Sequence, residues 1–262
     1  MTELTSEGLK LLSQAADLPS ITVLGALEGT LWPEELVEVR ELEGPSVIAL
    51  LRSRYSGEYY INVVCSERCG KAVSEVVFSY LLSADSAWVV VSNPRLVDEM
   101  VGLGARIGET LALHLMSVDA HSFRQAPRPA GFDFSGLDEH DLGAASALLS
   151  SWGEDKAAAA PDMVMRGNAF GAWFENELVG IVGTVAMTSD WWQIGYLFVD
   201  PEFRGRGLGK YLASLVTSDA LGRAREVFGV IEYDNAVARA ILARIGYRSL
   251  STSILVSLRS SR

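Results

Sequence analysis

The sequence has few of the residues that mark secreted, membrane-spanning or metal-binding proteins. It contains only two cysteines among 262 residues, Cys65 and Cys69, too few for a disulfide framework, so we expect two reduced thiols. The N-terminal segment carries acidic residues where a signal peptide would carry cations. No apolar run approaches the ~20 residues that cross a bilayer. We therefore expect a cytoplasmic protein with no membrane partner.

Basic residues are also scarce. The chain has 33 acidic against 22 basic residues, a net charge of −11 and an isoelectric point near 4.8. Such a surface repels phosphate backbones, so we expect no nucleic-acid partner. The three histidines lie far from the cysteines in sequence, and we predict no metal site. Hydrophobic residues, at 49%, and 24 glycines beside 8 prolines indicate a globular chain.

One stretch without periodicity divides the chain. Residues 119–136 (DAHSFRQAPRPAGFDFSG) contain Pro127 and Pro129 and show no sustained period of either 2 or 3.6 residues. We predict a linker over residues 121–136. The flanking parts, residues 1–120 and 137–262, are each long enough to have a hydrophobic core of their own.

The two parts resemble each other. The segment VCSERCGKAVSEVV in the first part aligns with VDPEFRGRGLGKYL in the second, and further on Asn93 aligns with Asn235 and Gly104 with Gly246. Each part then has the pattern strand, turn, long helix, strand, helix, glycine, strand. This pattern predicts a mixed α/β fold with two central sheets flanked by helices. Chance similarity between amphipathic segments is the alternative, but the matching order favours duplication.

The second part contains a glycine-rich turn between a strand, predicted over residues 193–199, and a helix, predicted over residues 211–220. The turn reads EFRGRGLGK and covers residues 202–210. Unpaired N–H groups along such a turn, together with the positive end of the helix dipole, suit a phosphate or a pyrophosphate. A surface turn with solvated cations is the alternative. Three cations oppose the acidic charge of the rest of the chain: Arg204, Arg206 and Lys210.

The spacing of these glycines differs from that of two other phosphate-binding turns. A P-loop has Ser or Thr after its lysine, whereas Tyr211 follows Lys210 here. A Rossmann turn has the pattern G-x-G-x-x-G, whereas this turn has G-x-G-x-G.

The turn resembles the acyl-CoA loop of the general N-acetyltransferases, the GNAT superfamily, written [QR]-x-x-G-x-[GA]. Arg204, Gly207 and Gly209 fill this pattern. The superfamily's next signature, an Asn that opens a helix and a later Gly-Phe or Gly-Tyr, is matched by Asn235 and by Gly246 with its following Tyr. The resemblance covers roughly residues 134–258. Upstream, a helix predicted over 137–150 and a hairpin over 169–187 fit it as well.

The resemblance implies acetyl-CoA as co-substrate and gives contacts for it. The backbone of Leu197, Phe198 and Val199 is expected to hydrogen-bond the pantetheine arm, and the side chain of Asn235 to contact the CoA arm. Arg204, which opens the loop, is also expected to bind the cofactor. The pyrophosphate is expected to bind the amides of Gly205, Arg206, Gly207, Leu208, Gly209 and Lys210.

The usual acid and base residues of the superfamily are missing. The position of the common tyrosine acid is Leu242, and the position of a glutamate found in some members is Gln193. Glu232, in a strand just before the helix-opening Asn, is the remaining candidate for the base. A solvated strand carboxylate is the alternative role for Glu232.

Five aromatic residues each have two possible roles. Candidates for the acid, or else core aromatics, are Tyr196, Tyr233 and Tyr247. Trp191 and Trp192 either line an acceptor pocket or fill one.

In the first part, the positions that align with the glycine-rich loop carry other residues. Cys69, Ala72 and Ser74 stand where the second part has Arg204, Gly207 and Gly209. Added Cβ atoms crowd the approach of a pyrophosphate and disfavour positive φ. We predict that residues 1–120 form a degenerate acetyltransferase-like domain that binds no CoA, packs against the second domain and walls one side of the acceptor cleft. This tandem layout is similar to that of glycine N-acyltransferase-like proteins.

The leading functional hypothesis is an N-acetyltransferase that moves an acetyl group directly from acetyl-CoA to the primary amine of a small molecule or a peptide. We expect a monomer or a homodimer. One alternative is a CoA-binding sensor or regulatory protein without turnover, which the missing tyrosine and glutamate favour. Another is an interaction module built on two acetyltransferase-like folds.

Overall fold

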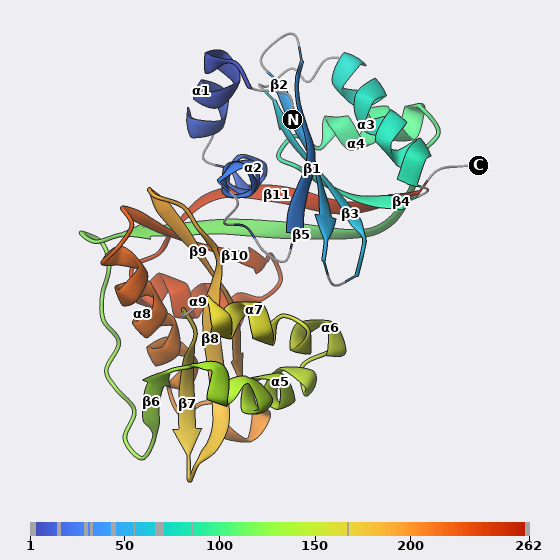
Figure 1. The fold of residues 1–262 in the computed structure, drawn as a ribbon. Helices are drawn as coiled ribbons and strands as arrows, with labels where there is room; N and C mark the ends of the chain where they lie inside the picture. The colour runs from blue at the N-terminus through green and yellow to red at the C-terminus, as the bar shows by residue number, and fades with distance from the viewer. Residues whose placement is uncertain are drawn as a thin grey trace. The chain divides into compact units, whose positions relative to one another are not determined.

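The computed structural model describes residues 4–14, 17–28, 31, 34–42, 46–54, 56–65, 71–84, 86–166 and 168–259. Strands and helices alternate along these residues (Figure 1), which confirms the predicted mixed α/β class. In the described part of the chain, no helix is long and apolar enough to span a membrane. The chain divides into two compact units. The first combines residues 1–115 with 232–234 and 250–262, and the second combines residues 116–231 with 235–249.

The first unit contains a mixed sheet. Its strands follow the order β1 (Glu34–Leu42), β2 (Ser46–Ser53), β3 (Tyr59–Cys65), β4 (Ser86–Val91), β11 (Arg248–Arg259) and β5 (Arg106–Asp119). Strands β1 to β3 pair antiparallel, β4 runs parallel to β3, and β11 is antiparallel to β4.

Helices cover both faces of this sheet because side chains along a strand alternate between the two faces. On one face Val63 of β3 packs in a cluster with α3 (Lys71–Ala84) and α4 (Arg95–Gly102). On the other face Val64 packs in a cluster with α1 (Ser6–Gln14) and α2 (Leu18–Leu27). Figure 1 shows the two helix pairs on opposite sides of these strands.

The last strand of the chain belongs to the first unit. Residues 254–259 of β11 pair with residues 86–91 of β4 in antiparallel register, and Val256 and Leu258 are fully buried in the core of the first unit. The division predicted from the sequence, into residues 1–120, 121–136 and 137–262, differs from these units at this point. Strand partners are set by long-range pairing, and the boundaries were drawn from local sequence patterns alone.

The second unit contains five further strands. Their order is β10 (Glu226–Glu232), β9 (Trp191–Val199), β8 (Glu177–Met187), β7 (Phe170–Phe174) and β6 (Asp133–Gly136). Strands β6 to β9 pair antiparallel, and β10 runs parallel to β9. On one face lie α8 (Leu208–Leu221) and α9 (Ala236–Arg244), and on the other lie α5 (Leu142–Ser150), the short α6 (Glu154–Ala157) and α7 (Ala160–Met165).

Glycines in β8 let helices pack closely on both faces of this strand. A Cβ atom added to Gly180 would meet the side chain of Leu212 in α8 at 2.9 Å. A Cβ atom added to Gly183 would overlap the side chain of Met163 in α7. The two helices therefore contact opposite faces of the same strand.

The predicted repeat is present in the structure. The first unit runs β3, α3, β4, α4, Gly104 and β5, and the second part of the chain runs β9, α8, β10, α9, Gly246 and β11. The two glycines follow the corresponding helices with φ angles of +105° and +103°. The predicted helix over 137–150 begins as a 3₁₀ turn capped by Asp138 and continues as α5. The predicted hairpin turns at Glu175 and Asn176, which both have positive φ.

The segment predicted as a linker is packed against the second unit. Ala126 is buried in the core cluster of that unit, and Nε2 of Gln125 donates to Oγ of Ser214 in α8 at 3.1 Å. The amide of Arg124 donates to the carbonyl of Ile245 at 3.0 Å. The end of the segment forms β6. Residues 121–136 are thus an integral part of this unit.

The prediction of two reduced thiols is wrong for Cys65, which is disulfide-bonded in the structure. Cys69, within residues 66–70, lies outside the described residues. Two cysteines are too few for a disulfide framework, but they suffice for a single disulfide bond.

Candidate functional site

Strands β9 and β10 separate halfway along their length. Their parallel pairing joins residues 191–194 to residues 226–229 and ends at Ile194 and Gly229. Residues 195–199 of β9 continue without a partner in β10, although Ile181 and Gly180 of β8 still pair with them on the other side. The edge of β9 that faces β10 is therefore open over the residues predicted to hold the pantetheine arm.

A β-bulge lies where the strands separate. Gly183 pairs with Gly195 and Ile181 with Phe198, so two residues of β9, Tyr196 and Leu197, stand opposite one residue of β8. Tyr196 has a φ of +53°, which is rare for a residue other than glycine. Such backbone strain costs about 1–3 kcal/mol, and it is found most often at functional sites.

The predicted phosphate loop connects β9 to α8. A 3₁₀ turn over Pro201–Phe203 follows the strand, and α8 begins at Leu208 with Gly207 as N-cap residue. The first amide with an acceptor in the helix is that of Tyr211, which donates to the carbonyl of Gly207 at 3.1 Å. Among the described residues, no hydrogen bond is made by the six preceding amides, those of residues 205–210. Six successive N–H donors are thus available to an anion.

The backbone of the loop depends on glycine. Gly205 and Gly207 have φ angles of +79° and +86°, which a residue with a Cβ atom adopts only at a cost. No heavy atom lies within 4 Å of a Cβ atom added to Gly205, and only Pro129 lies near one added to Gly207, at 3.6 Å. The space beside these two glycines is therefore largely open. The sequence prediction of a concave turn with exposed amides agrees with this geometry.

The arginines of the loop lie against aromatic rings. Nε of Arg204 donates to the carbonyl of Val199 at 3.0 Å, and its guanidinium lies 5.6 Å from the ring centroid of Phe198. Arg206 lies 5.1 Å from the ring centroid of Phe203. Both cations are thereby positioned beside the row of free amides.

In the described part of the first unit, the corresponding strands do not separate and the register shows no bulge. Its parallel strands β3 and β4 stay paired until Val63 meets Val91, the last residue of β4. The register between β2 and β3 runs from Ser46–Cys65 to Arg52–Tyr59 without a shift. The hydroxyl of Ser74 is buried and bonded to the carboxylate of Glu99. A closed strand pair leaves no edge for a pantetheine arm.

Two predicted site residues follow β10. Asn235 is the N-cap of α9, where its Oδ1 accepts from the amide of Ala238 at 3.0 Å. Its predicted contact with the CoA arm stays a prediction, and capping gives the residue a structural role as well. Glu232 is exposed at the end of β10 and is grouped with the first unit. Its catalytic role also stays a prediction.

Of the tyrosines considered as acids, Tyr247 has a structural role and Tyr233 is exposed. Tyr247 is fully buried, and burial raises the pKa of its phenol far above the ordinary range, so the phenol holds its proton. Its hydroxyl shares a hydrogen bond of 2.8 Å with Oγ1 of Thr217. Tyr233 is 52% exposed, and its amide donates to the carbonyl of Ala112 at 2.7 Å. Tyr247 is therefore a core residue, as the alternative interpretation of the sequence held.

Four other residues considered above lie in the closed half of β9 or in α9. Trp191 packs edge-on against Phe228, and Trp192 belongs to the core cluster of the second unit. Gln193 pairs with Phe228 before the strands separate. Leu242 is buried and packs on Gly229, which has no side chain to displace it. The two tryptophans fill the core, and the usual tyrosine position is part of the core too.

An aromatic stack beside the bulge was missed in the sequence. Trp152, in the connection between α5 and α6, stacks on Phe198 with ring centroids 5.3 Å apart and planes 8° from parallel. Its ring also lies edge-on to Tyr196 and near the ammonium of Lys156. Trp152 is 44% exposed. An isolated tryptophan in a Gly- and Ser-flanked connection carried no signal, because its aromatic partners are more than 40 residues away in the chain.

Comparisons with known proteins agree with this geometry. Residues 142–247 match the model of the acetyltransferase (GNAT) family. No curated protein matches the chain. The family resemblance predicted from the loop and the helix-opening Asn is confirmed over this part of the chain.

Solved structures resemble nearly the whole chain. A GCN5-related N-acetyltransferase from Kribbella flavida is 17% identical, with a TM-score of 0.64 over 97% of this chain and 96% of that chain. A tandem GNAT protein from the clavulanic acid biosynthesis pathway is 16% identical, with a TM-score of 0.64 over 98% and 94%. A GNAT-family acetyltransferase from Colwellia psychrerythraea is 12% identical, with a TM-score of 0.60 over 99% and 98%. These likenesses confirm the predicted tandem fold.

Proposed function

We propose, because residues 142–247 fall within the acetyltransferase (GNAT) family, that this protein transfers an acetyl group from acetyl-CoA to a primary amine. The observation that carries the proposal is the row of six amides without acceptors beside an opened strand pair. A pyrophosphate needs several converging donors, and a pantetheine arm needs an open strand edge. The second unit has both features within one connection of its sheet.

The residues of the loop fit the expected contacts of acetyl-CoA. The amides of residues 205–210 would hold the pyrophosphate, with Arg204 and Lys210 adding positive charge. The open edge of Leu197, Phe198 and Val199 would pair with the pantetheine amides. The carbonyl of Val199 already accepts from Arg204, so this carbonyl would be shared or released on binding.

The proposed reaction depends more on a general base than on a general acid. The amine nitrogen attacks the thioester carbonyl, the carbon–sulfur bond breaks, and the amine loses a proton to a base. We assign this base to Glu232, directly or through a water molecule. The leaving thiol has a pKa near the ~8.5 of a free cysteine, so it departs as a thiolate at little cost near neutral pH. The core position of Leu242 is then compatible with turnover.

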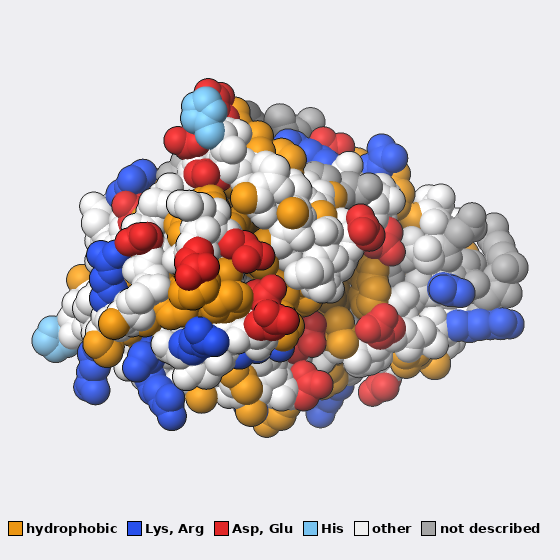
Figure 2. Space-filling view, turned by 90° about the horizontal axis from the view of Figure 1, so that it is seen from below, with side chains coloured by type: hydrophobic (Ala, Val, Ile, Leu, Met, Phe, Trp, Pro, Cys, Tyr) orange, Lys and Arg blue, Asp and Glu red, His pale blue; other side chains and the backbone are white. Residues whose placement is uncertain are grey.

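The surface charge favours one class of acceptor. The net charge is −11, and Figure 2 shows Asp and Glu side chains spread over the visible face. An acidic surface raises the local concentration of cations, which favours cationic acceptors such as polyamines, aminoglycosides or basic peptide N-termini. The exposed ring of Trp152 beside the bulge offers an apolar surface to the body of an acceptor.

A CoA-binding sensor without turnover is the second candidate. Two substitutions favour it. Leu242, at the position of the usual tyrosine acid, lies in the core, and Gln193 stands where some members have a glutamate. Calorimetry with acetyl-CoA and with free CoA, followed by thiol release against a panel of amines, separates the candidates. An enzyme binds acetyl-CoA and releases thiol with at least one amine. A sensor binds without release, and a protein that binds neither ligand contradicts both candidates.

A further inference from the structure

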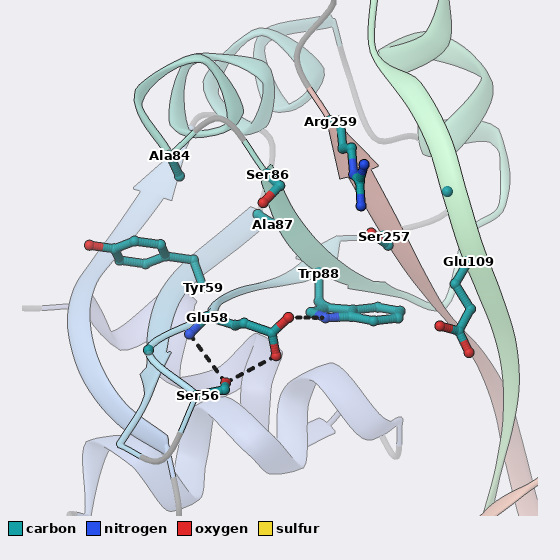
Figure 3. A pocket seen from close by; sticks show the side chains of 12 residues that line it. Ser56, Glu58, Tyr59, Ala84, Ser86, Ala87, Trp88, Glu109, Ser257 and Arg259 are labelled. Carbon is teal, nitrogen blue, oxygen red and sulfur yellow. Dashed lines mark hydrogen bonds between the residues drawn. The ribbon is translucent and has the colours of Figure 1, made fainter. Parts of the chain in front are cut away.

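The first unit contains a hollow of about 420 Å³ at the end of the sheet where β3 and β4 begin. It lies between the turn that joins β2 to β3, the start of β5 and the end of β11 (Figure 3). Its lining shares no residue with the loop over residues 204–210 or with the opened edge of β9. The volume falls within the range of small-molecule sites, about 300–1,000 Å³.

The floor of the hollow combines a tryptophan with a fixed carboxylate. The indole Nε1 of Trp88 donates to Oε1 of Glu58 at 3.4 Å, and Oγ of Ser56 donates to Oε2 of the same carboxylate at 3.0 Å. Figure 3 shows the Glu58 side chain directed at the edge of the Trp88 ring. Neither donor is charged, so the full negative charge of Glu58 remains available to a ligand.

Two further charged groups face the hollow. Glu109 comes from β5 and Arg259 from β11, and Figure 3 shows both beside Trp88. In the described part of the chain, no ion pair is formed by Glu58, Glu109 or Arg259. Arg52, outside the lining, donates to the carbonyl of Gly57 at 3.5 Å and lies 5.9 Å from the ring centroid of Tyr59. Within the described ranges, the two carboxylates and the guanidinium therefore have no partner of opposite charge.

This charge pattern is complementary to one kind of small molecule. We propose that the hollow binds a basic amino acid, which carries one carboxylate and two cationic groups. Arg259 would bind the carboxylate in the bidentate geometry that a guanidinium favours. Glu58 and Glu109 would each bind a cationic group, and the face of Trp88 would contact the aliphatic stem and the cation nearest to it. The lining charge of −1 is balanced by a ligand of charge +1.

Calorimetric titration of the full chain with lysine tests the proposal, without acetyl-CoA and at low ionic strength, where exposed charges are least screened. We expect saturable 1:1 binding. Norleucine lacks the side-chain ammonium and cadaverine lacks the carboxylate, and each should bind at least about tenfold more weakly, since each loses one charge-assisted hydrogen bond. No saturable binding of lysine, or equal affinity for lysine and cadaverine, would overturn the assignment.

Two surface variants locate the site. Glu109→Gln and Arg259→Gln should each weaken lysine binding at least about tenfold, since each removes one of the paired charges. Glu75→Gln and Arg95→Gln, exposed on α3 and α4 outside the lining, should leave the affinity unchanged. Thermal unfolding of each variant checks the fold. Unchanged affinity in both Glu109→Gln and Arg259→Gln would show that lysine binds elsewhere.

The same titration is independent of the acetyltransferase proposal. Gly207→Val alters only the loop of the second unit and should leave lysine binding intact. A protein that binds lysine but not acetyl-CoA would support this site and contradict the proposed function. A protein that binds acetyl-CoA but not lysine would do the reverse.

Discussion

Ile194 and Gly229 form the last pair that joins β9 to β10, and beyond them the two strands diverge. In the first unit the equivalent strands stay joined to the end of β4, where Val63 meets Val91. The bulge at Tyr196 and Leu197 has no counterpart in the continuous register between β2 and β3. Two repeats of one pattern have thus produced one opened strand pair and one closed strand pair.

The geometry of the loop predicts that Gly207→Val strongly lowers the affinity for acetyl-CoA. A β-branched residue resists the φ of +86° and places methyl groups where the phosphate would approach. We expect acetyl-CoA affinity to fall beyond detection by calorimetry.

Gly131→Val is the matched control for Gly207→Val. Gly131 has a φ of +81° in the same unit, and no atom lies within 4 Å of an added Cβ. The backbone strain is thus similar, while the loop is untouched. A folded Gly207→Val protein with the parent affinity would remove the loop from the cofactor site.

The closed pair of β3 and β4 predicts one acetyl-CoA per chain. A pantetheine arm needs a free strand edge, and β4 presents its backbone to β3 up to Val91. Calorimetric stoichiometry should be one, and Gly207→Val should abolish all binding rather than half of it. A stoichiometry of two would show that the first unit also opens.

The proposed base predicts a catalytic defect for Glu232→Gln. General base catalysis contributes about 10²–10⁴-fold, so kcat on a genuine acceptor should fall by that factor with acetyl-CoA affinity intact. The parent rate should rise with pH as the acceptor amine deprotonates. Asp234→Asn, two residues away and also exposed, is the control and should retain the parent kcat. If Glu232→Gln keeps more than about half of the parent kcat, the carboxylate is not the base.

Because the hydroxyl of Tyr247 is buried, we expect its removal to lower the stability of the protein without a catalytic defect. Tyr247→Phe leaves the hydroxyl of Thr217 without its partner in the core, which should lower the free energy of unfolding by about 1–3 kcal/mol. Denaturant unfolding measures this loss, and replacing both partners in Thr217→Val with Tyr247→Phe should recover part of it. A change in the pH profile of kcat would instead indicate a role in proton transfer.

The position of β11 predicts that a C-terminal residue stabilises the first unit. Leu258→Ala removes a fully buried side chain from the core formed with β4 and α3, which should lower the free energy of unfolding by about 2–5 kcal/mol. Amide hydrogen exchange in β4 should accelerate. Thr252→Ala, at an exposed position of the same strand, should change neither quantity. Unchanged exchange in β4 of Leu258→Ala would contradict the pairing.

The sequence alone determined the local elements and the loop. Alternation and glycine spacing predicted β9, α8 and the turn between them, because strand and helix periods and the need for positive φ are properties of a few neighbouring residues. The helix predicted over residues 137–150 and the hairpin predicted over residues 169–187 were likewise readable from short stretches. For the same reason Leu242 could be recognised as unsuited to proton transfer before its burial was known.

Which segments meet in space depends on the tertiary structure. Three features depend on contacts between residues far apart in the chain. They are the pairing of β11 within the first unit, the separation of β9 from β10, and the stacking of Trp152 on Phe198. Such contacts are selected by the free energy of burying whole faces of sheets and helices, to which each local pattern contributes only a small part. The hollow around Trp88 has the same origin, because its walls come from four strands that no sequence motif connects.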